Sequence, residues 1–129
     1  MNLGYTILFV PDVAAAVAFY EEAFGLQRTS LNVAFATMDT GATTLAFGSE
    51  ANEKRELGAQ EFRQSRIDDI PGGFQISFVA DDVALAFDRA IAAGASAVYP
   101  PRTMPWGQTV SRVRDLNGVL VSIVTEPRF

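Results

Sequence analysis

The alternation of hydrophobic and polar positions predicts a strand followed by a helix near the start of the chain. Residues 5–10 are β-branched and aromatic, which is typical of a buried strand. Pro11 ends this run, and Asp12 is suited to cap the helix that follows. The apolar residues of 13–24 recur at helical spacing, and Gly25 fits the position just after a last helical turn.

The same order of elements returns in the second half of the chain. Residues 75–80 are typical of a strand, and Asp82 with Val83 opens a helical pattern that Gly94 closes. Aligning Asp82 with Asp12 superimposes the two patterns, so we expect two tandem copies of one unit.

Three strand-like segments with turn residues between them follow each predicted helix. They are residues 27–32, 33–39 and 43–47 in the first half and residues 97–99, 109–115 and 119–125 in the second. Asp39-Thr40-Gly41 and residues 115–118 are the corresponding hairpin turns. The expected fold class is therefore α+β, with tandem βαβββ repeats that form a curled mixed sheet around a cleft.

The chain length of 129 residues is that of a single domain. We expect repeat one over about residues 1–50, a linker over about residues 51–73 and repeat two over about residues 74–129. The linker is charged in its first part and ends in Pro71-Gly72-Gly73, and a short helix from about Asn52 to Leu57 is expected within it.

Composition excludes several classes of function. The chain has 15 acidic and 10 basic residues and a net charge of -5, whereas a nucleic-acid-binding protein needs a basic patch. It has no cysteine and no histidine, which excludes thiolate catalysis, disulfides and a Ser-His-Asp triad. A zinc site would have to rely on carboxylates, which is unusual.

Hydropathy predicts neither a membrane span nor a secretion signal. The apolar stretches are far shorter than a span, and residues 1–4 lack a basic segment followed by a long apolar run. We therefore expect a cytoplasmic protein without nucleic-acid or membrane partners.

Four stretches in a fixed order along the chain carry a family resemblance. They are Tyr5 to Val13 with Ala18-Phe19-Tyr20 and Phe24-Gly25-Leu26; Gly41 to Phe47; Gln75 to Val83 with Ala93-Gly94-Ala95; and Pro105-Trp106-Gly107-Gln108 leading to Arg114 to Gly118. Together they resemble the vicinal oxygen chelate superfamily, which includes glyoxalase I, extradiol dioxygenases, fosfomycin-resistance enzymes and bleomycin-resistance proteins. The resemblance implies a glyoxalase/bleomycin-resistance-like fold and a symmetric homodimer.

The resemblance also implies a metal site whose ligands come from the first and last strands of each repeat. The matching positions here are Tyr5, Ala46, Gln75 and Ser122, where metal-using members have His or Gln, Glu, His and Glu. Ala46 has no donor atom, Ser122 offers a neutral hydroxyl, and Gln75 is a weak carbonyl ligand. The sequence therefore predicts a cavity without a metal, a cofactor or a catalytic residue.

Several residues at or near these positions have both a functional and a structural interpretation. Tyr5 either presents its hydroxyl to a ligand or packs against the core, and Gln75 either orients a polar ligand or, as a buried amide, satisfies backbone groups. Trp106 is either a lid that stacks on a flat ligand or a plug at the sheet edge. Ser122 shares its side of the strand with Leu120 and Val124 if it faces the cavity. The candidate cavity residues are Tyr5, Ala46, Gln75, Trp106, Ser122, Phe35 and Phe47.

Other side chains are assigned by strand and helix spacing. Met38 is a further residue that could line the cavity floor, beside Phe35 and Phe47. Arg112 and Arg114 should face away from the side that Val113 covers, and Arg114 with Asp115 is expected to form a local surface pair. The residues assigned to the core are Phe9, Phe19, Phe24, Phe78 and Phe87.

Three alternative functions are consistent with this interpretation of the sequence. The first is a protein that binds a small, partly aromatic or apolar molecule in a metal-free cavity, which includes drug sequestration of the bleomycin-resistance type. The alternative is a divalent-metal-dependent lyase or dioxygenase of the same superfamily with an atypical site. The third is a scaffold whose cavity is vestigial.

Overall fold

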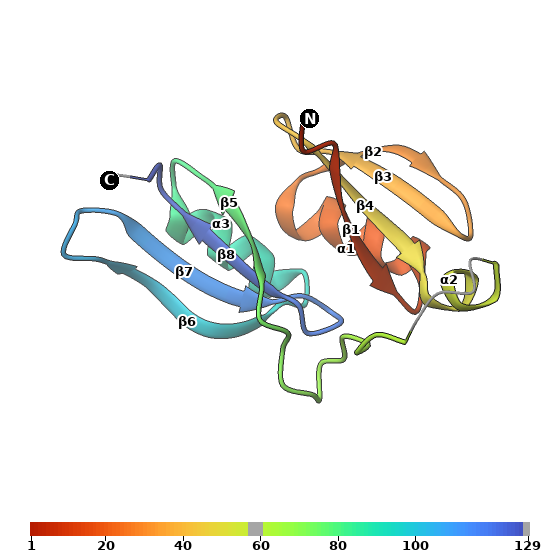
Figure 1. Cartoon of the computed structure of the whole chain (residues 1–129). Coiled ribbons are helices and arrows are strands. Elements are labelled where there is room, and N and C mark those ends of the chain that lie inside the picture. The colour runs from red at the N-terminus through yellow and green to blue at the C-terminus, as the bar shows by residue number, and fades with distance from the viewer. Residues whose placement is uncertain (57–60, 128–129) are drawn as a thin grey trace. The chain divides into compact units, whose positions relative to one another are not determined.

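The computed structural model describes residues 1–56 and 61–127 of the chain. The chain divides into two compact units, residues 1–64 and residues 65–129, which contain the two predicted repeats. Each unit has a four-stranded sheet with a helix packed against it (Figure 1). The α+β fold class and the tandem βαβββ order are confirmed.

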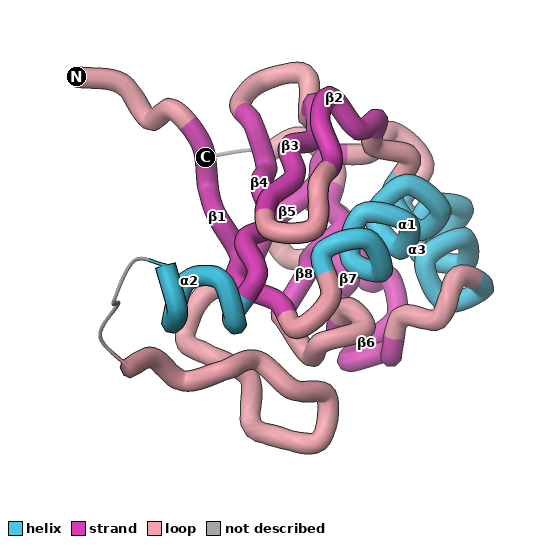
Figure 2. The backbone as a smooth tube through the Cα atoms, turned by 90° about the vertical axis from the view of Figure 1, so that its right-hand side faces the viewer, coloured by secondary structure: helices cyan, strands magenta, loops and turns pink. Residues whose placement is uncertain are grey.

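The first unit contains five elements of the repeat and one short additional helix. They are β1 (Tyr5–Val10), α1 (Val13–Phe24), β2 (Gln27–Leu31), β3 (Phe35–Asp39), β4 (Thr44–Ser49) and α2 (Glu50–Glu56). The strand order is β1-β4-β3-β2, with β1 parallel to β4 and the other pairs antiparallel. Figure 2 shows α2 as a short helix directly after β4.

Helix α1 begins and ends as its sequence predicts. The Asp12 side chain accepts a hydrogen bond from the Ala15 backbone N–H at 3.0 Å, and Gly25 has a φ of 71° after the last turn. Tyr20 of α1 is fully buried, and its ring centroid lies 5.0 Å from that of Phe47 on β4. This contact identifies the face of the first sheet that α1 covers.

The second unit repeats the arrangement. Its elements are β5 (Gln75–Val79), α3 (Val83–Ala92), β6 (Ser96–Thr103), β7 (Thr109–Arg114) and β8 (Leu120–Val124). The strand order is β5-β8-β7-β6, with β5 parallel to β8. Asp82 caps α3 by accepting from the Leu85 N–H at 3.0 Å, and Gly94 follows it with a φ of 111°.

The core of the second unit lies between α3 and its sheet. The helix packs against β6, β7 and β8 and buries its apolar face. Val113, Val121 and Ile123 are among the buried apolar strand residues, and their register and strand alternation place them on one side of the sheet. Their neighbours along each strand therefore point to the opposite side.

Some element bounds differ from those that the sequence predicts. β6 extends to Thr103 although the sequence limits it to residues 97–99, because pairing with β7 resumes after irregular register at Pro100 and Pro101. β3 begins at Phe35 because the Asn32 side chain accepts from the N–H groups of Ala34 and Phe35 and forms a turn.

The short linker helix also differs in its bounds. It begins at Glu50 rather than near Asn52, and Ser49 accepts a hydrogen bond from the Asn52 N–H at its start. The predicted end at Leu57 lies outside the described residues. None of the helices in the described part of the chain has the length and apolarity needed to cross a membrane.

Candidate ligand-binding faces

Each sheet has a face opposite its packed helix, α1 or α3, which we call the open face. In a strand, successive side chains alternate between the two sides of the sheet. The Tyr20–Phe47 contact places Phe47 on the helix side of the first sheet, so Ala46 and its register partner Ile7 lie on the open face. In the second sheet, buried Val121 and Ile123 place Ser122 on the open face.

The four positions that the family resemblance marks all lie on open faces, two in each unit. Ala46 pairs with Ile7 across β4 and β1, and Ser122 pairs with Ser77 across β8 and β5. Ile7 lies two residues after Tyr5, the first residue of β1, and Ser77 lies two residues after Gln75, the first residue of β5. Ala46 and Ser122 therefore occupy equivalent places in the two repeats.

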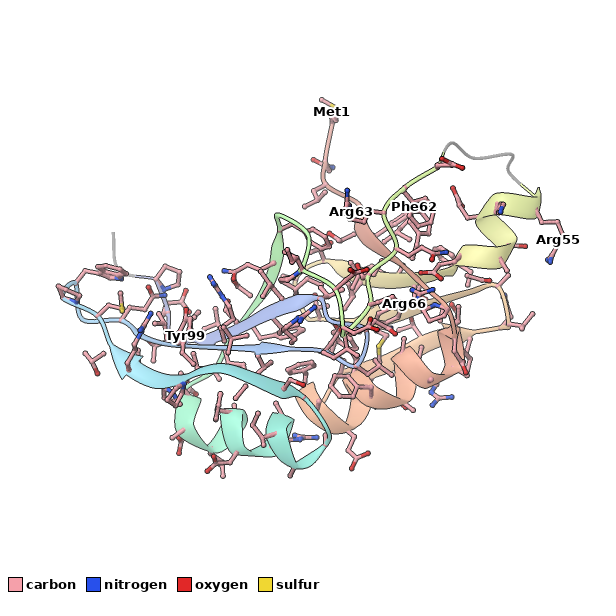
Figure 3. All side chains as sticks on the ribbon, turned by 90° about the horizontal axis from the view of Figure 1, so that it is seen from below. Met1, Arg55, Phe62, Arg63, Arg66 and Tyr99 are labelled. Atoms are coloured by element: carbon pink, nitrogen blue, oxygen red, sulfur yellow. The ribbon has the colours of Figure 1, made fainter. Side chains whose placement is uncertain are left out.

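The open face of the first unit combines aromatic and hydroxyl groups. The ring of Phe9 lies 5.0 Å from that of Phe62, centroid to centroid, and a Cβ on Gly48 would stand 3.0 Å from Phe9 Cδ1. The glycine thus leaves room for the Phe9 ring. Phe9 is therefore half-buried on the open face, whereas the sequence assigned it to the core. Figure 3 labels Phe62, which follows α2 in the chain.

Hydroxyl groups gather on the same face near β2 and β3. Thr37 Oγ1 lies 2.7 Å from both Thr29 Oγ1 and Ser30 Oγ, where β2 carries a bulge. Phe35, two residues before Thr37 on β3, is half-buried and shares this face. Flat apolar surface and hydroxyl groups thus stand side by side.

Two of the candidate cavity-floor residues lie on the wrong side of the sheet. Phe47 and Met38 are both fully buried, Phe47 against Tyr20 of α1 and Met38 paired with Leu45 on the same side. The prediction placed them by strand membership without a fixed register, which leaves the facing side undecided. Phe47 is therefore a core residue and leaves the candidate set.

The open face of the second unit carries a chain of polar side chains. Gln75 Nε2 donates to Ser77 Oγ at 3.3 Å, and the Ser77 and Ser122 hydroxyls share a hydrogen bond. Ser122 is buried, whereas Gln75 is exposed, so the alternative in which Gln75 is a buried amide does not apply.

The second unit also contains an arginine cluster that was not predicted from the sequence. Arg112 of β7 is the register partner of Ser122, and its Cζ lies 5.4 Å from the ring centroid of Tyr99 on β6. Arg102 Cζ lies 4.1 Å over the same ring. The alternation of Arg112 with Val113 predicted its face correctly, but the strand bounds predicted for β6 omitted Arg102.

Arg114 has a structural role, which corrects the predicted surface pair with Asp115. Its guanidinium donates to the carbonyl oxygens of Gly118, Ile67, Arg66 and Asp69 at 2.7–3.2 Å. Asp115 is buried, and its carboxylate accepts from the backbone N–H groups of the following turn. Arg114 thereby fastens the segment before β5, where Figure 3 labels Arg66, to the end of β7.

Trp106 lies in the loop between β6 and β7 with its ring half exposed. Its Nε1–H donates to Gln108 Oε1 at 2.9 Å, and Gln108 Nε2 in turn donates to the Thr125 carbonyl at 3.0 Å. The indole N–H is thus satisfied within the loop while 51% of the residue stays exposed. Both the lid and the plug interpretation stay predictions.

A comparison with protein-family models identifies the family of the chain. The model described as the Glyoxalase/Bleomycin resistance protein/Dioxygenase superfamily matches residues 2–123. The chain belongs to this superfamily. No curated protein sequence matches the chain.

Several solved structures share the fold. A glyoxalase-related enzyme from Fulvimarina pelagi superposes with a TM-score of 0.82 at 24% identity, covering 98% of this chain and 89% of that one. A glyoxalase/bleomycin resistance protein/dioxygenase family enzyme from Burkholderia phytofirmans PsJN gives 0.79 at 26%, covering 97% and 98%. TioX from Micromonospora sp. ML1 gives 0.76 at 23%, covering 98% and 100%.

The metal that many superfamily members use does not fit the residues present at the family positions. Ala46 supplies no donor atom, and the Ser122 hydroxyl is already hydrogen-bonded to Ser77. First-row metals prefer imidazole or carboxylate ligands. Among residues 1–56 and 61–127, no group of three or more acidic side chains is placed to hold a metal ion.

Proposed function

We propose that this protein binds a small, partly aromatic or apolar molecule on its open faces, without a metal of its own. The observation that carries the proposal is the pair of equivalent positions Ala46 and Ser122. An alanine and a hydrogen-bonded serine stand there, and neither is a carboxylate that would ligate a metal.

The surroundings of these positions support binding of a flat molecule with a few polar groups. Phe9 and Phe35 offer ring surface in the first unit, and the accessible hydroxyl groups of Thr37 and Ser77 offer hydrogen bonds. Small-molecule sites typically combine apolar walls with a small number of placed polar groups.

Binding rather than catalysis is proposed because the side chains that usually activate a nucleophile are missing. The sequence has no histidine, and Ser122 has a neutral hydroxyl as its hydrogen-bond partner. Sequestration of a drug-like compound, as the bleomycin-resistance part of the superfamily description suggests, is the form of binding that we propose.

Thermal-shift screening with aromatic and cationic compounds tests the proposal. A ligand that binds the folded protein raises its apparent stability by mass action. The hits are then measured against Phe35→Ala, which removes a ring from the open face, and against Phe24→Ala, which removes an equally half-buried ring from α1. We expect weaker binding in the first variant and unchanged binding in the second.

Metal analysis of the purified protein tests the metal-free part. Stoichiometric nickel, zinc, manganese or iron that a chelator removes together with ligand binding would contradict the proposal and favour the metal-dependent lyase or dioxygenase. A protein that no compound of a broad panel stabilises would instead fit the scaffold.

A further inference from the structure

We propose that the open face of the second sheet recognises the carboxylate group of a small molecule through Arg112 and Arg102. The proposal rests on the proposed binding function and deepens it, because it names the charged group that the ligand carries. The arginine cluster, which consists of Tyr99, Arg102 and Arg112, provides the evidence (Figure 3 labels Tyr99).

Arg112 has a hydrogen-bond donor without an acceptor. The residue is half-buried in the middle of β7, and its Nε is fully buried with no hydrogen-bond partner among the described residues. A buried donor that is left unpaired is costly, and most buried polar groups in proteins are paired. Among the described residues no hydrogen bond to the Arg112 guanidinium is found, and only Nε of the guanidinium is fully buried, so an anion would approach the terminal Nη atoms.

Arg114 is a structural arginine on the same face and provides a comparison for Arg112. It lies two residues further along β7, and its guanidinium donates to four backbone carbonyls. Backbone carbonyls of the second unit thus accept the hydrogen bonds of the Arg114 guanidinium. Arg112 has no such partner for its Nε. The contrast separates Arg114, whose guanidinium is held by backbone carbonyls, from Arg112, whose terminal Nη atoms remain for a ligand.

The charge of the cluster points to an anionic ligand. Arg102 and Arg112 both lie over the Tyr99 ring, at 4.1 and 5.4 Å from its centroid, and no acidic side chain in the described residues pairs with either. An anion bound beside this cluster would be attracted by both cations. The cluster is a local positive site on a chain whose net charge is -5.

The shape of the donors and their neighbours favours a carboxylate over a phosphate. A guanidinium presents a planar fork that matches the two oxygens of a carboxylate. Phosphate sites commonly add helix N-termini, but α3 packs on the opposite side of this sheet. Ser77, which is exposed and hydrogen-bonded to buried Ser122, offers a hydroxyl group to the rest of the ligand.

Titration of the intact protein followed by NMR of the arginine Nε–Hε signals tests the proposal. The probes are benzoate and 1-naphthoate, each compared with its neutral amide, and phenyl phosphate. We expect the two carboxylates to shift the Arg112 signal to saturation and the amides to leave it unchanged. A carboxylate presents acceptors to the fork with a full charge, whereas an amide does not.

Three substitutions separate recognition by the fork from a general effect of charge. Arg112→Gln should weaken benzoate binding about tenfold or more, as loss of a charge-assisted hydrogen bond does. Arg112→Lys keeps the charge without the fork, and its affinity for benzoate should lie between those of the wild type and Arg112→Gln. Arg89→Gln removes the same charge from α3, on the helix layer of the same unit, and should bind as the wild type does.

Arg102→Gln provides a second test that does not disturb a buried position, because Arg102 is exposed. It should weaken benzoate binding in the same direction as Arg112→Gln. Equal benzoate binding by the wild type and by both glutamine variants would overturn the proposal.

The remaining outcomes separate this proposal from the proposed function. Amides that bind as tightly as the carboxylates, or phenyl phosphate that binds more tightly than benzoate, would overturn the carboxylate assignment and leave small-molecule binding intact. If no probe shifts any signal and no compound of the thermal-shift panel stabilises the protein, both proposals fail.

Discussion

Gly118 shows at the residue scale how a turn and a side chain depend on each other. Its φ is 88°, a conformation that L-residues with a side chain rarely adopt. A Cβ there would lie 2.4 Å from an Nη of Arg114 and 2.6 Å from the Arg66 carbonyl oxygen. Both atoms belong to the network that fastens the segment before β5.

We therefore expect Gly118→Ala to lower the free energy of unfolding by about 1–3 kcal/mol, as strained backbone and a displaced guanidinium together would. Urea denaturation measures the loss. Gly73→Ala is the matched control, because Gly73 has no positive φ and no atom within 4 Å of its Cβ position. Equal losses in the two variants would show that the close approach at Gly118 is unimportant.

Residue types that act through their neighbours in the chain were predictable from the sequence, and those that act through distant residues were not. Asp12 and Gly25 cap α1 as predicted because each contacts only its own helix. Arg114 instead reaches carbonyl oxygens 45–48 residues away, which no local pattern reveals. The unpaired Nε of Arg112 likewise becomes visible only when both adjoining strands are placed.

The helix caps are equivalent in the two units, and their energetic contributions should match. Asp12 and Asp82 each accept one backbone N–H of the first turn at 3.0 Å. We expect Asp12→Ala and Asp82→Ala each to cost about 1 kcal/mol of stability. Urea denaturation of both variants checks this value.

Asp81 provides the control for these substitutions, since it is exposed and directly precedes the cap residue of α3. Asp81→Ala should change the stability little. If Asp81→Ala destabilised the protein as much as Asp82→Ala does, general charge rather than capping would explain the effect.

The ion pair between α1 and β2 gives a pH-dependent prediction at the element scale. Arg28 Nη2 lies 2.6 Å from Glu21 Oε1, and this hydrogen bond to Arg28 lowers the pKa of Glu21 below its ordinary value of 4.5. Because the folded-state pKa is the lower one, the stabilisation is present above pH 4.5 and is lost as the pH falls through the folded pKa.

NMR titration of the Glu21 side-chain carboxylate should therefore give a midpoint below 4.5 in the wild type. The midpoint should rise toward 4.5 in Arg28→Gln, where the donor of the charge-assisted hydrogen bond is lost. An unchanged midpoint in that variant would mean that the pair does not persist in solution.

The order of the elements along the chain was predictable from the repeat, whereas the facing side of individual residues was only partly so. Buried Phe47 and Met38 turned out to face α1 because the register of β4 with β1 and β3 decides which side each residue takes. Pro100 and Pro101 concealed the true length of β6, since proline usually argues against a strand interior.

At the scale of the whole molecule, the sheet edges differ in how they are protected. The outer strands are β1 and β2 in the first unit and β5 and β6 in the second. β2 has a bulge and β6 has two prolines and an irregular register, both of which discourage pairing with another strand. β1 and β5 contain no proline and no charged residue.

We propose from this asymmetry that the protein is a homodimer in which a second copy covers unprotected edge surface. Light scattering during size-exclusion chromatography should give about twice the chain mass of 13.9 kDa. Thr6→Lys places a charge on exposed β1, and we expect it to shift the protein toward the monomer because an edge lysine opposes strand pairing.

Gln27→Lys is the matched control, since it adds the same charge to the exposed but bulged β2 edge and should leave the mass unchanged. A monomeric wild type would contradict the dimer directly. Dissociation by Gln27→Lys to the same extent as by Thr6→Lys would instead place the interface elsewhere, because the β1 edge would then have no special part in assembly. The dimer prediction thus tests whether the edge strands without a bulge, a proline or a charge, β1 and β5, are the ones that the assembled protein covers.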